Sequence, residues 1–357
     1  MTAPVGSGAV PGWISAHLFH AGSLDNLIAQ VIAPLEGELR EELAGFFFLR
    51  YWEGGPHLRL RVKPRGGGDA GRIRGLIRRR ADAYFAEHPS VRDIPSADYQ
   101  ALAARLAHAE RRADHEDRLY ANDSVEFITY LPEHHVYGEG ARIAAVEEHF
   151  TDSSRLACEI LATGPAQGRR VAIGLAAYTL TMAAYLPDPQ VAAQAFALRL
   201  GATPVPPDVE EVFRREAGGL LRQTRRLWNR PIPGPLAAWS SSIRTLRDRL
   251  TELGAALPDP ADLGSPAAFL ASALEPPANV SARAPSAHAI AGALEQSAPA
   301  VAKALEPPEL GALTARAVPY ILLRCTHLLH NRLGITPAAE NRLALLTMRT
   351  LAALHER

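Results

Sequence analysis

FFFLRYWEGGPHLRLR, residues 46–61, is the stretch of sequence that decides the fold of the first part of the chain. Two runs rich in apolar residues flank a short Glu-Gly-Gly-Pro connection at 53–56, and this arrangement predicts a β-hairpin. Because side chains alternate faces along a strand, His57, Arg59 and Arg61 are expected on one face, and the leucines between them on the other.

The segments around the hairpin complete an α+β lobe, which we place at residues 12–150. A short apolar run at 13–19 predicts a strand, and apolar residues repeat at helical spacing from Leu24 to Leu35. A basic helix is expected soon after the hairpin. The segment Val125–Leu131 is a candidate third strand of the same sheet.

The remainder of the chain, 151–357, is predicted as a mainly helical lobe because its apolar residues recur near every 3.6 positions. The segment 254–310 is rich in Ala, Pro and Ser and is expected to hold short helices and loops. A long helix is expected over Leu313–Leu333, kinked or divided by Pro319. The fold class is therefore α+β, with an N-terminal lobe of mixed sheet and helix packed on a larger, mostly helical C-terminal lobe, and 1–357 forming a single enzyme.

Composition and charge exclude several classes of protein. The 38 Lys and Arg residues balance 38 Asp and Glu residues, so the chain has no general attraction for DNA. Cys158 and Cys325 lie in apolar helical patterns and are predicted as buried thiols rather than a disulfide. The N-terminus lacks the features of a secretion signal, and no apolar run is long enough to span a membrane. We therefore expect a cytoplasmic protein with no membrane partner.

Arg59 and Arg61 give the densest signal of a site. Two guanidinium groups two residues apart on one sheet face can form a rigid fork for carboxylate or carbonyl oxygens. The alternative is a solvated edge strand whose arginines have no function, because such alternation is common in sheets with one wet face. The pattern alone leaves both interpretations open.

The hairpin sequence closely resembles the signature of the lantibiotic dehydratase C-terminal domain, also called the thiopeptide-type bacteriocin biosynthesis domain. Elements in the family's order support the resemblance: WISAHLF at 13–19 precedes the hairpin, and YLPE at 130–133, EEHF at 147–150 and THLLHNRLG at 326–334 follow it. Each element alone is weak, but the ordered set spans most of the chain.

The resemblance implies roles for individual residues. In this family the paired arginines of the HLRLR strand and the histidine of the late helix serve the elimination active site, which implies such roles for Arg59, Arg61 and His327. His327 and Asn331 are four residues apart and therefore share one helix face. Histidine suits proton transfer because its ordinary pKa lies near neutrality. A lone histidine in an apolar helix is otherwise more often a hydrogen-bonded core residue.

One departure from the family's pattern concerns glutamate elimination. The family's elimination enzymes carry a Glu-x-x-Arg-Tyr-Gly-Gly element whose arginine contributes to that reaction. Here Val136 occupies the arginine position and Glu139 that of the second glycine. Since valine cannot bind a glutamyl carboxylate, the resemblance favours the thiopeptide pyridine synthases. These join two dehydroalanines of a leader-bearing linear peptide in a formal (4+2) aza-cycloaddition, and loss of water and of the leader then forms a pyridine-centred macrocycle.

Two alternatives stay open. The first is a stand-alone glutamate-elimination enzyme that makes dehydroalanine from glutamylated Ser or Thr, which would need another cation to replace the one missing at Val136. The second is a non-catalytic peptide-binding partner of a modification complex. Retention of Arg59, Arg61 and His327 argues against the second.

The candidate site residues fall into two groups. The catalytic candidates are Arg59, Arg61, Tyr137 and His327. The substrate-binding candidates are His57, Arg50, Glu133, His134, His135 and Asn331. For the pair His134-His135, a surface turn beside Pro132 is the competing interpretation.

The expected partner is a ribosomal precursor peptide with a leader and a dehydrated core, and other maturation enzymes are further candidates. Between Arg50 and Arg80 there are ten basic residues against two acidic ones, which indicates either an acidic leader as ligand or a solvated helix face. A tRNA partner is not expected, because no aromatic stacking platform accompanies the patch. No cofactor or metal is expected, since Gly66–Gly68 matches no nucleotide-binding loop and His327 and His330 lack a nearby third ligand.

Overall fold

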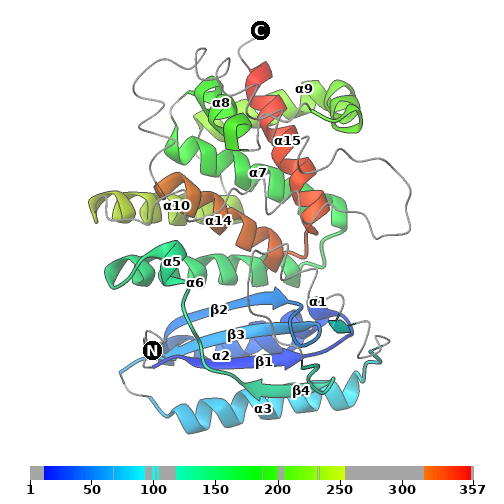
Figure 1. Cartoon of the computed structure of the whole chain (residues 1–357), viewed down its shortest axis with the longest axis vertical. Coiled ribbons are helices and arrows are strands. Elements are labelled where there is room, and N and C mark those ends of the chain that lie inside the picture. The colour runs from blue at the N-terminus through cyan, green and yellow to red at the C-terminus, as the bar shows by residue number, and fades with distance from the viewer. Residues whose placement is uncertain are drawn as a thin grey trace, which may run out of the picture. The chain divides into compact units, whose positions relative to one another are not determined.

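The computed structural model of the chain describes residues 12–66, 68–92, 99, 100, 103, 118–186, 188–199, 205–230, 232, 234–253 and 317–354. The chain divides into two compact units (Figure 1). The first holds the described residues up to Arg170 together with His327–Ile335, and the second holds the others. The prediction for 254–310 lies outside the described residues, as does the start of the helix expected from Leu313.

A four-stranded antiparallel sheet forms the centre of the first unit. β1 (Ile14–Phe19), β2 (Leu43–Tyr51), β3 (His57–Pro64) and β4 (Ser124–Phe127) lie in the order β2-β3-β1-β4. The predicted hairpin is confirmed as β2 and β3, and the candidate third strand as β4, which is shorter than expected. The prediction of an α+β fold with a mostly helical remainder is also confirmed.

Several helices of the first unit follow from apolar spacing and end caps. α1 (Leu24–Leu27) begins after Ser23, whose hydroxyl accepts a hydrogen bond from the backbone N–H of Asn26. The helix continues through the π-helical turn η1 (Ile28–Ile32) and α2 (Ala33–Leu39) into the short 3-10 helix η2 (Arg40–Glu42). The predicted basic helix is α3 (Ala70–Glu87), which is capped by Asp69 and contacts β1 and β4.

Side chains of α6 (Ala141–Ala162) cover the outer edge of β2. The hydroxyl of Thr151 accepts a hydrogen bond from the N–H of Phe46 at 3.1 Å, and that of Ser154 accepts one from Phe48 at 3.3 Å. An edge strand otherwise presents unpaired backbone groups, which are costly to bury. α6 packs on β2 and belongs to the first unit.

The described part of the second unit is helical. Its elements are most of α7 (Gln167–Tyr185), α8 (Pro189–Arg199), α9 (Pro207–Asn229), α10 (Pro235–Glu252), the first part of α14 (Ala317–Arg332), and α15 (Pro337–Ala353). α15 packs on α8 and α9, and the Tyr178 hydroxyl donates to the Glu340 carboxylate at 2.8 Å. Pro319 lies within the described part of α14, which continues through it to Arg332, so the proline does not divide that part of the helix.

The two cysteines are free and buried, as predicted. Burial raises the pKa of the Cys158 thiol to about 12, so this thiol stays protonated near neutral pH. In the part of the chain that the structure describes, no helix is long and apolar enough to cross a membrane.

Candidate functional site

The predicted polar face of β3 extends across the sheet. His57, Arg59 and Arg61 alternate with buried leucines, as predicted. The strand register places His17 of β1 directly opposite Arg59, and Ser15 directly opposite Arg61. Residues directly opposite each other lie on the same face of a sheet. Two strands therefore contribute polar side chains to one face, which we call the arginine face.

Arg61 is a buried cation on this face. Its side chain is 6% exposed, and no carboxylate among the described residues pairs with it. One guanidinium nitrogen donates to the Leu60 carbonyl at 3.3 Å and another lies 3.1 Å from Nε2 of His17. The guanidinium also lies 5.4 Å from the ring centroid of Tyr130. Burial, together with the nearby charge of Arg59, lowers the pKa of Arg61 to about 9.

The unpaired charge of Arg61 gives this face its chemical character. A buried charge without a counterion is costly, and an entering oxygen anion or polarised carbonyl would relieve that cost. Arginine has five N–H donors. Two of them have partners in the hydrogen bonds above, which leaves three for an incoming ligand.

His17 and His57 contribute two neutral imidazoles beside the arginines. Their rings stack with centroids 4.9 Å apart. Because a guanidinium can only donate, Nε2 of His17 accepts from Arg61 and the proton of the ring resides on Nδ1. Burial, together with the charge of Arg61, places the pKa of His17 far below its ordinary value.

His57 is fixed in one tautomer by the turn that precedes it. Its Nδ1 lies 2.8 Å from the Gly55 carbonyl, which can only accept, so Nδ1 carries the proton. Its Nε2 is buried and has no hydrogen-bond partner among the described residues. Burial lowers the pKa of His57 to about 3, so the ring is neutral near pH 7. An acceptor atom is therefore available next to the two arginines.

Arg59 differs from Arg61 because it has a counterion. Its guanidinium donates to the Glu53 carboxylate at 3.0 Å and lies 3.3 Å from the ring centroid of Tyr51. Such stacking and ion pairing fix the plane of the guanidinium. Of the two arginines, Arg59 is held in place by its neighbours and Arg61 has the unpaired charge.

The Glu53-Gly54-Gly55-Pro56 turn positions Glu53 for this pairing. Gly54 and Gly55 have φ values of +81° and +114°, which residues with a side chain rarely adopt. A Cβ on Gly54 would also lie 2.7 Å from the Tyr120 ring. The turn is held by the Tyr99 hydroxyl, which accepts from the Gly54 N–H, and by the Tyr120 N–H, which donates to the Gly54 carbonyl.

A buried acid lies near Arg61. Glu147 of α6 is 8% exposed, and its carboxyl group lies close to the side chains of Tyr130 and Trp13. Burial raises the pKa of Glu147 more than Tyr130, the charge of Lys63 and Trp13 together lower it. Burial and the neighbouring Glu147 also raise the pKa of Tyr130. Tyr130 therefore lies near both the buried acid and the guanidinium of Arg61.

The altered loop of the family element forms a single helical turn, α5 (His134–Tyr137). Tyr137 is buried, and its ring makes an edge contact with Phe150 of α6 at 5.5 Å. Val136 is buried too. His134 is half-buried with Nδ1 3.1 Å from the Gly138 carbonyl. The remaining two candidates here, Glu133 and His135, are exposed.

Asn331 and Arg50 join α14 to the edge of β2. The Asn331 carboxamide accepts from the Arg50 N–H at 2.9 Å and donates to the Arg50 carbonyl at 3.0 Å. The Arg50 side chain pairs with Asp25 and donates to the Arg332 carbonyl at 3.1 Å. The register pairs Arg50 with Leu58, so Arg50 points away from the arginine face.

His327 lies one helical turn before Asn331 on α14 and is half-buried. The structure therefore brings together three of the predicted site residues, His57, Arg59 and Arg61, and places Arg50 on the opposite face. Sequence reasoning missed His17, Tyr130 and Glu147 as site residues, although each lies inside a motif that carried the family resemblance. Their unusual polarity within apolar runs was the available signal.

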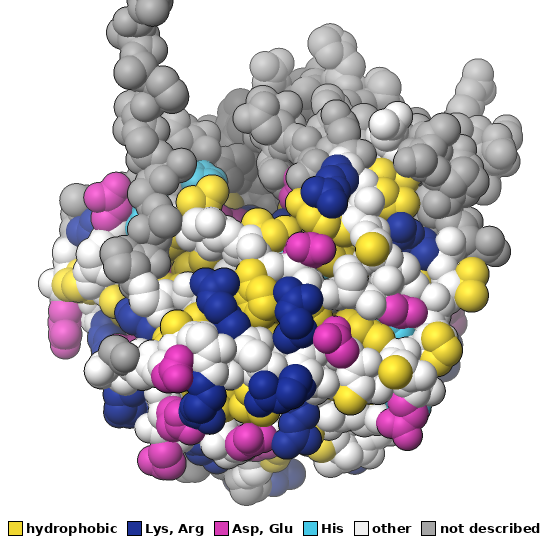
Figure 2. Space-filling model, turned by 90° about the horizontal axis from the view of Figure 1, so that it is seen from below, with side chains coloured by type: hydrophobic (Ala, Val, Ile, Leu, Met, Phe, Trp, Pro, Cys, Tyr) yellow, Lys and Arg dark blue, Asp and Glu magenta, His cyan; other side chains and the backbone are white. Residues whose placement is uncertain are grey.

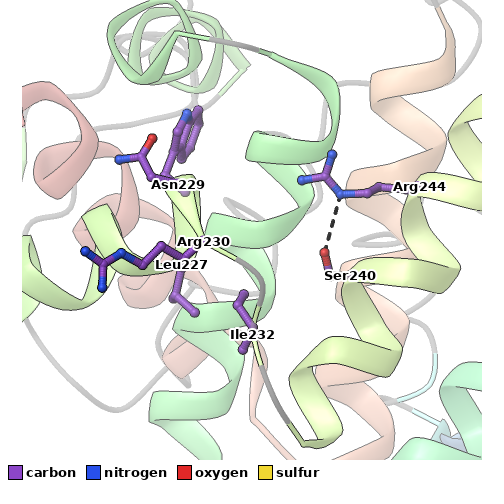
Figure 3. A pocket seen from close by; sticks show the side chains of 7 residues that line it. Leu227, Asn229, Arg230, Ile232, Ser240 and Arg244 are labelled. Atoms are coloured by element: carbon purple, nitrogen blue, oxygen red, sulfur yellow. Dashed lines mark hydrogen bonds between the residues drawn. The ribbon is translucent and has the colours of Figure 1, made fainter.

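A pocket of about 310 Å³ lies in the second unit, between the end of α9 and α10 (Figure 3). It is lined by Leu227, Trp228, Asn229, Arg230, Ile232, Ser240 and Arg244. Arg244 donates to the Ser240 hydroxyl at 3.4 Å. None of the predicted site residues lines it. Among the described residues, no three His, Cys, Asp or Glu side chains are grouped as metal ligands would be.

Comparison with known proteins gives one family and several similar folds. The family model described as "Lantibiotic biosynthesis dehydratase C-term" matches residues 13–351. The solved structure "Pyridine synthase, TbtD, from thiomuracin biosynthesis" is similar with a TM-score of 0.66 and 17% identity, covering 96% of this chain and 99% of that one. TsrL is similar with a TM-score of 0.59 and 18% identity, covering 97% and 95%.

A third solved structure is the tRNA-dependent lantibiotic dehydratase MibB from Microbispora sp. 107891, with a TM-score of 0.44 and 18% identity. The match covers 98% of this chain and 28% of that one. No curated protein matches the chain in sequence. At these identities the structural likenesses to TbtD and TsrL concern the fold.

Proposed function

The chain belongs to the family of lantibiotic biosynthesis dehydratase C-terminal domains, and on this premise we propose that it is a thiopeptide-maturation enzyme, a lyase-like cyclase. Its substrate is a linear precursor peptide that carries a leader and two dehydroalanines. The reaction is a formal (4+2) aza-cycloaddition followed by loss of water and of the leader. The observation that carries the proposal is the buried, uncompensated guanidinium of Arg61 on a chain whose fold is similar to that of a pyridine synthase.

The proposed reaction balances without an oxidant or a cofactor. An amide carbonyl next to the first dehydroalanine takes its iminol form, so that the alkene, the nitrogen and the former carbonyl carbon form an azadiene. One new carbon–carbon bond joins the two alkene CH₂ carbons, and the other joins the former carbonyl carbon to the α-carbon of the second dehydroalanine. Loss of the iminol hydroxyl as water, and of the leader as its carboxamide, then aromatises the ring.

We assign Arg61 to the amide oxygen that becomes the iminol hydroxyl and then leaves as water. Its three N–H donors without partners would bind the amide oxygen and favour the iminol form, because fixed donors in a dry site stabilise developing charge. Arg59, held by Glu53 and Tyr51, would orient a second carbonyl of the peptide. Holding the two alkenes together supplies much of the rate through proximity.

Proton transfer in the proposed reaction needs an acid for the departing hydroxyl and a base for the ring. Glu147 is a suitable acid because burial raises its pKa. Nε2 of His57 is a buried acceptor beside the arginines. His327 remains a catalytic candidate from the family resemblance, and Tyr137 remains one from the sequence. His134, His135, Glu133 and Asn331 are proposed substrate-binding residues.

The proposal is tested with two substrates under identical conditions. The first is a leader-bearing peptide with two dehydroalanines, and the second is the corresponding peptide with a glutamylated serine. We expect the first to lose its leader and gain a pyridine absorbance, and the second to stay unchanged. Elimination of glutamate from the second, without reaction of the first, would contradict the proposal.

A second function, glutamate elimination, is favoured by one observation. A buried cation without a counterion suits a glutamyl carboxylate at least as well as a carbonyl oxygen. The charge of Arg61 would then have to serve in place of the arginine that Val136 replaces. The glutamylated peptide above distinguishes this function from cyclisation, and retention of either activity excludes a purely non-catalytic peptide-binding role.

A further inference from the structure

Charge is divided unevenly along α9 of the second unit. The carboxylates of its first half pair with arginines of α9 or α15. These pairs are Glu211 with Arg214, Glu216 with Arg215, Asp208 with Arg342 and Glu210 with Arg349. After Glu216 the sequence contains no Asp or Glu until Asp248, but it contains six arginines. These are Arg222, Arg225, Arg226, Arg230, Arg244 and Arg247.

The arginines in the second half of α9 are exposed. Arg222 and Arg226 are four residues apart and therefore lie on one face of the helix, where like charges repel. The helix dipole favours a cation in the last turn, which accounts for Arg226 but not for Arg222. In the part of the chain that the structure describes, no carboxylate pairs with Arg222, Arg225 or Arg226.

The basic helix α3 of the first unit has a different arrangement of charge. It lies on the face that Figure 2 shows, where acidic side chains lie among those of Lys and Arg. Two of its arginines have carboxylate partners, Arg72 with Glu42 and Arg80 with Glu38. Mixed charge of this kind is typical of a solvated helix face. The acid-free end of α9 instead favours a ligand of opposite charge.

The pocket of about 310 Å³ lies at this end of α9. Its apolar lining consists of Leu227, Trp228 and Ile232. Its cations are Arg230 and Arg244, and both are exposed. In Figure 3 the Arg244 side chain extends from α10 toward the end of α9, while Arg230 points away from it. The pocket therefore combines an apolar lining with a positively charged rim that solvent can reach.

Arg244 is the cation best placed to meet a ligand in the pocket. Its Nε donates to the hydroxyl of Ser240, one turn earlier on α10, at 3.4 Å. Arginine has five N–H donors, and the other four of Arg244 have no hydrogen-bond partner among the described residues. A carboxylate could accept two of them in parallel, which is the strongest pairing of these groups.

From these features we infer that the end of α9 and the pocket beside it bind an acidic peptide segment that has one apolar side chain among its carboxylates. The apolar side chain would enter the pocket against Leu227 and Ile232. One neighbouring carboxylate would contact Arg244, and others would follow the face of Arg222 and Arg226. The volume is at the lower end of the roughly 300–1,000 Å³ of ligand pockets, which suits a single side chain and its flanking backbone.

A peptide fits this surface better than a nucleic acid does. The chain as a whole has no net charge, so a polyanion is not attracted to it in general. The apolar lining suits an aliphatic or aromatic side chain. Under the proposed function, on which this identification rests, the segment is a part of the precursor peptide that does not react. Its binding would keep the precursor attached and raise the effective concentration of the reacting part.

The experiment measures binding of a fluorescein-labelled peptide, one phenylalanine flanked on both sides by glutamates, to the full chain by fluorescence anisotropy. The probe has no dehydroalanine, so docking and cyclisation can fail independently. We expect Arg244→Glu to weaken binding about tenfold or more, because it replaces a charge-assisted contact with a repulsive one. Arg222→Glu, outside the pocket lining, is a second variant that should weaken binding severalfold.

The matched control is Arg215→Glu, an identical change at an exposed position in the first half of the same helix. It should change binding less than about threefold, because solvent and salt screen exposed charges at a distance. Circular dichroism checks that every variant is folded. Equal weakening by Arg215→Glu and Arg244→Glu would show only a general effect of charge and would overturn the inference.

Two further probes separate the charged contacts from the apolar one. A peptide with glutamines in place of the glutamates should not bind. A peptide with glycine in place of the phenylalanine should bind about tenfold more weakly, as loss of a buried apolar side chain implies. The inference is overturned if the parent peptide does not bind, if either altered peptide binds as well as the parent, or if a single-stranded RNA of the same length binds more tightly and loses that binding in Arg244→Glu.

Discussion

His17 and Arg61 form a hydrogen bond in which a neutral imidazole holds a buried guanidinium, with Nε2 3.1 Å from the arginine nitrogen. A carboxylate in the position of His17 would orient Arg61 equally well but would also neutralise its charge. The imidazole is kept neutral by burial and by the arginines beside it. Arg61 is thereby oriented while its positive charge remains available to a substrate oxygen.

Two substitutions at one position test this relationship. His17→Gln keeps a neutral acceptor near the position of Nε2, so we expect cyclisation to stay within about tenfold of the wild-type rate. His17→Glu would place a carboxylate beside Arg61 and should reduce kcat by about 100-fold, the effect of losing one preorganised donor. Steady-state kinetics gives kcat of both variants, and circular dichroism checks that both are folded. Equal kcat values for the two variants would contradict the proposed role of His17.

The neutral histidines make the stability of the chain depend on pH. The folded pKa of His57 is about 3, against about 6.5 in the unfolded chain. Between these values the unfolded state binds one more proton, so the stabilisation present above about pH 6.5 is lost as the pH falls toward 3, by up to about 1.4 kcal/mol per pH unit. The raised pKa of Glu147 has the opposite effect, because its contribution to the unfolding free energy is lost as the pH rises.

Urea unfolding of the wild type and of His57→Asn at pH 7 and pH 5 isolates this contribution, because Asn can donate to the Gly55 carbonyl but does not titrate. We expect the wild type to lose more unfolding free energy than the variant on acidification. Parallel losses would show that His57 is not buried in its neutral form.

Asn331 is expected to act on stability. Its carboxamide pairs both backbone groups of Arg50 at the edge of β2. Asn331→Ala would leave these groups without partners at a cost of about 1–3 kcal/mol, since an unsatisfied buried polar group loses its full desolvation energy. Urea unfolding measures the loss. An unchanged unfolding free energy with a raised KM would instead support the predicted substrate-binding role of Asn331.

Gly54 is expected to tolerate no side chain. Gly54→Ala would strain a residue at a φ of +81° and would push a methyl group into the Tyr120 ring, so we expect a loss of about 1–3 kcal/mol. Gly37→Ala in α2 is the matched control, because a Cβ there meets no atom within 4 Å and alanine favours the helix. Thermal unfolding should shift downward for Gly54→Ala and slightly upward for Gly37→Ala. A neutral Gly54→Ala would contradict the described turn.

The hairpin was predictable because its information is local. The alternation from His57 to Arg61 and the glycine turn before it determine both the strands and the shared face, and the structure confirms them. The position of Arg50 depends on the hairpin register. The two strands pair Tyr51 with His57, so Arg50 falls on the leucine side of the sheet, a result that the length of the turn decides.

The neighbours of Arg61 were not predictable in the same way. His17 reaches Arg61 through the pairing of β1 with β3, and Glu147 reaches Tyr130 only once α6 has packed on the sheet. Likewise, Asn331 is separated from Arg50 by 281 residues along the chain. A short motif contains no information about contacts at such separations, and in this fold those contacts determine which arginine keeps an unpaired charge.

The most direct test of the proposed cyclisation is the mass of the leader fragment that the enzyme releases from a dehydrated, leader-bearing peptide, with Arg61→Lys as the comparison. The account predicts that the wild-type enzyme releases the leader as a carboxamide that retains the nitrogen of the second dehydroalanine, together with a pyridine-containing core. Arg61→Lys should release far less, because lysine lacks the guanidinium fork. Release of the leader as a free carboxylic acid, or equal release by Arg61→Lys, would contradict it.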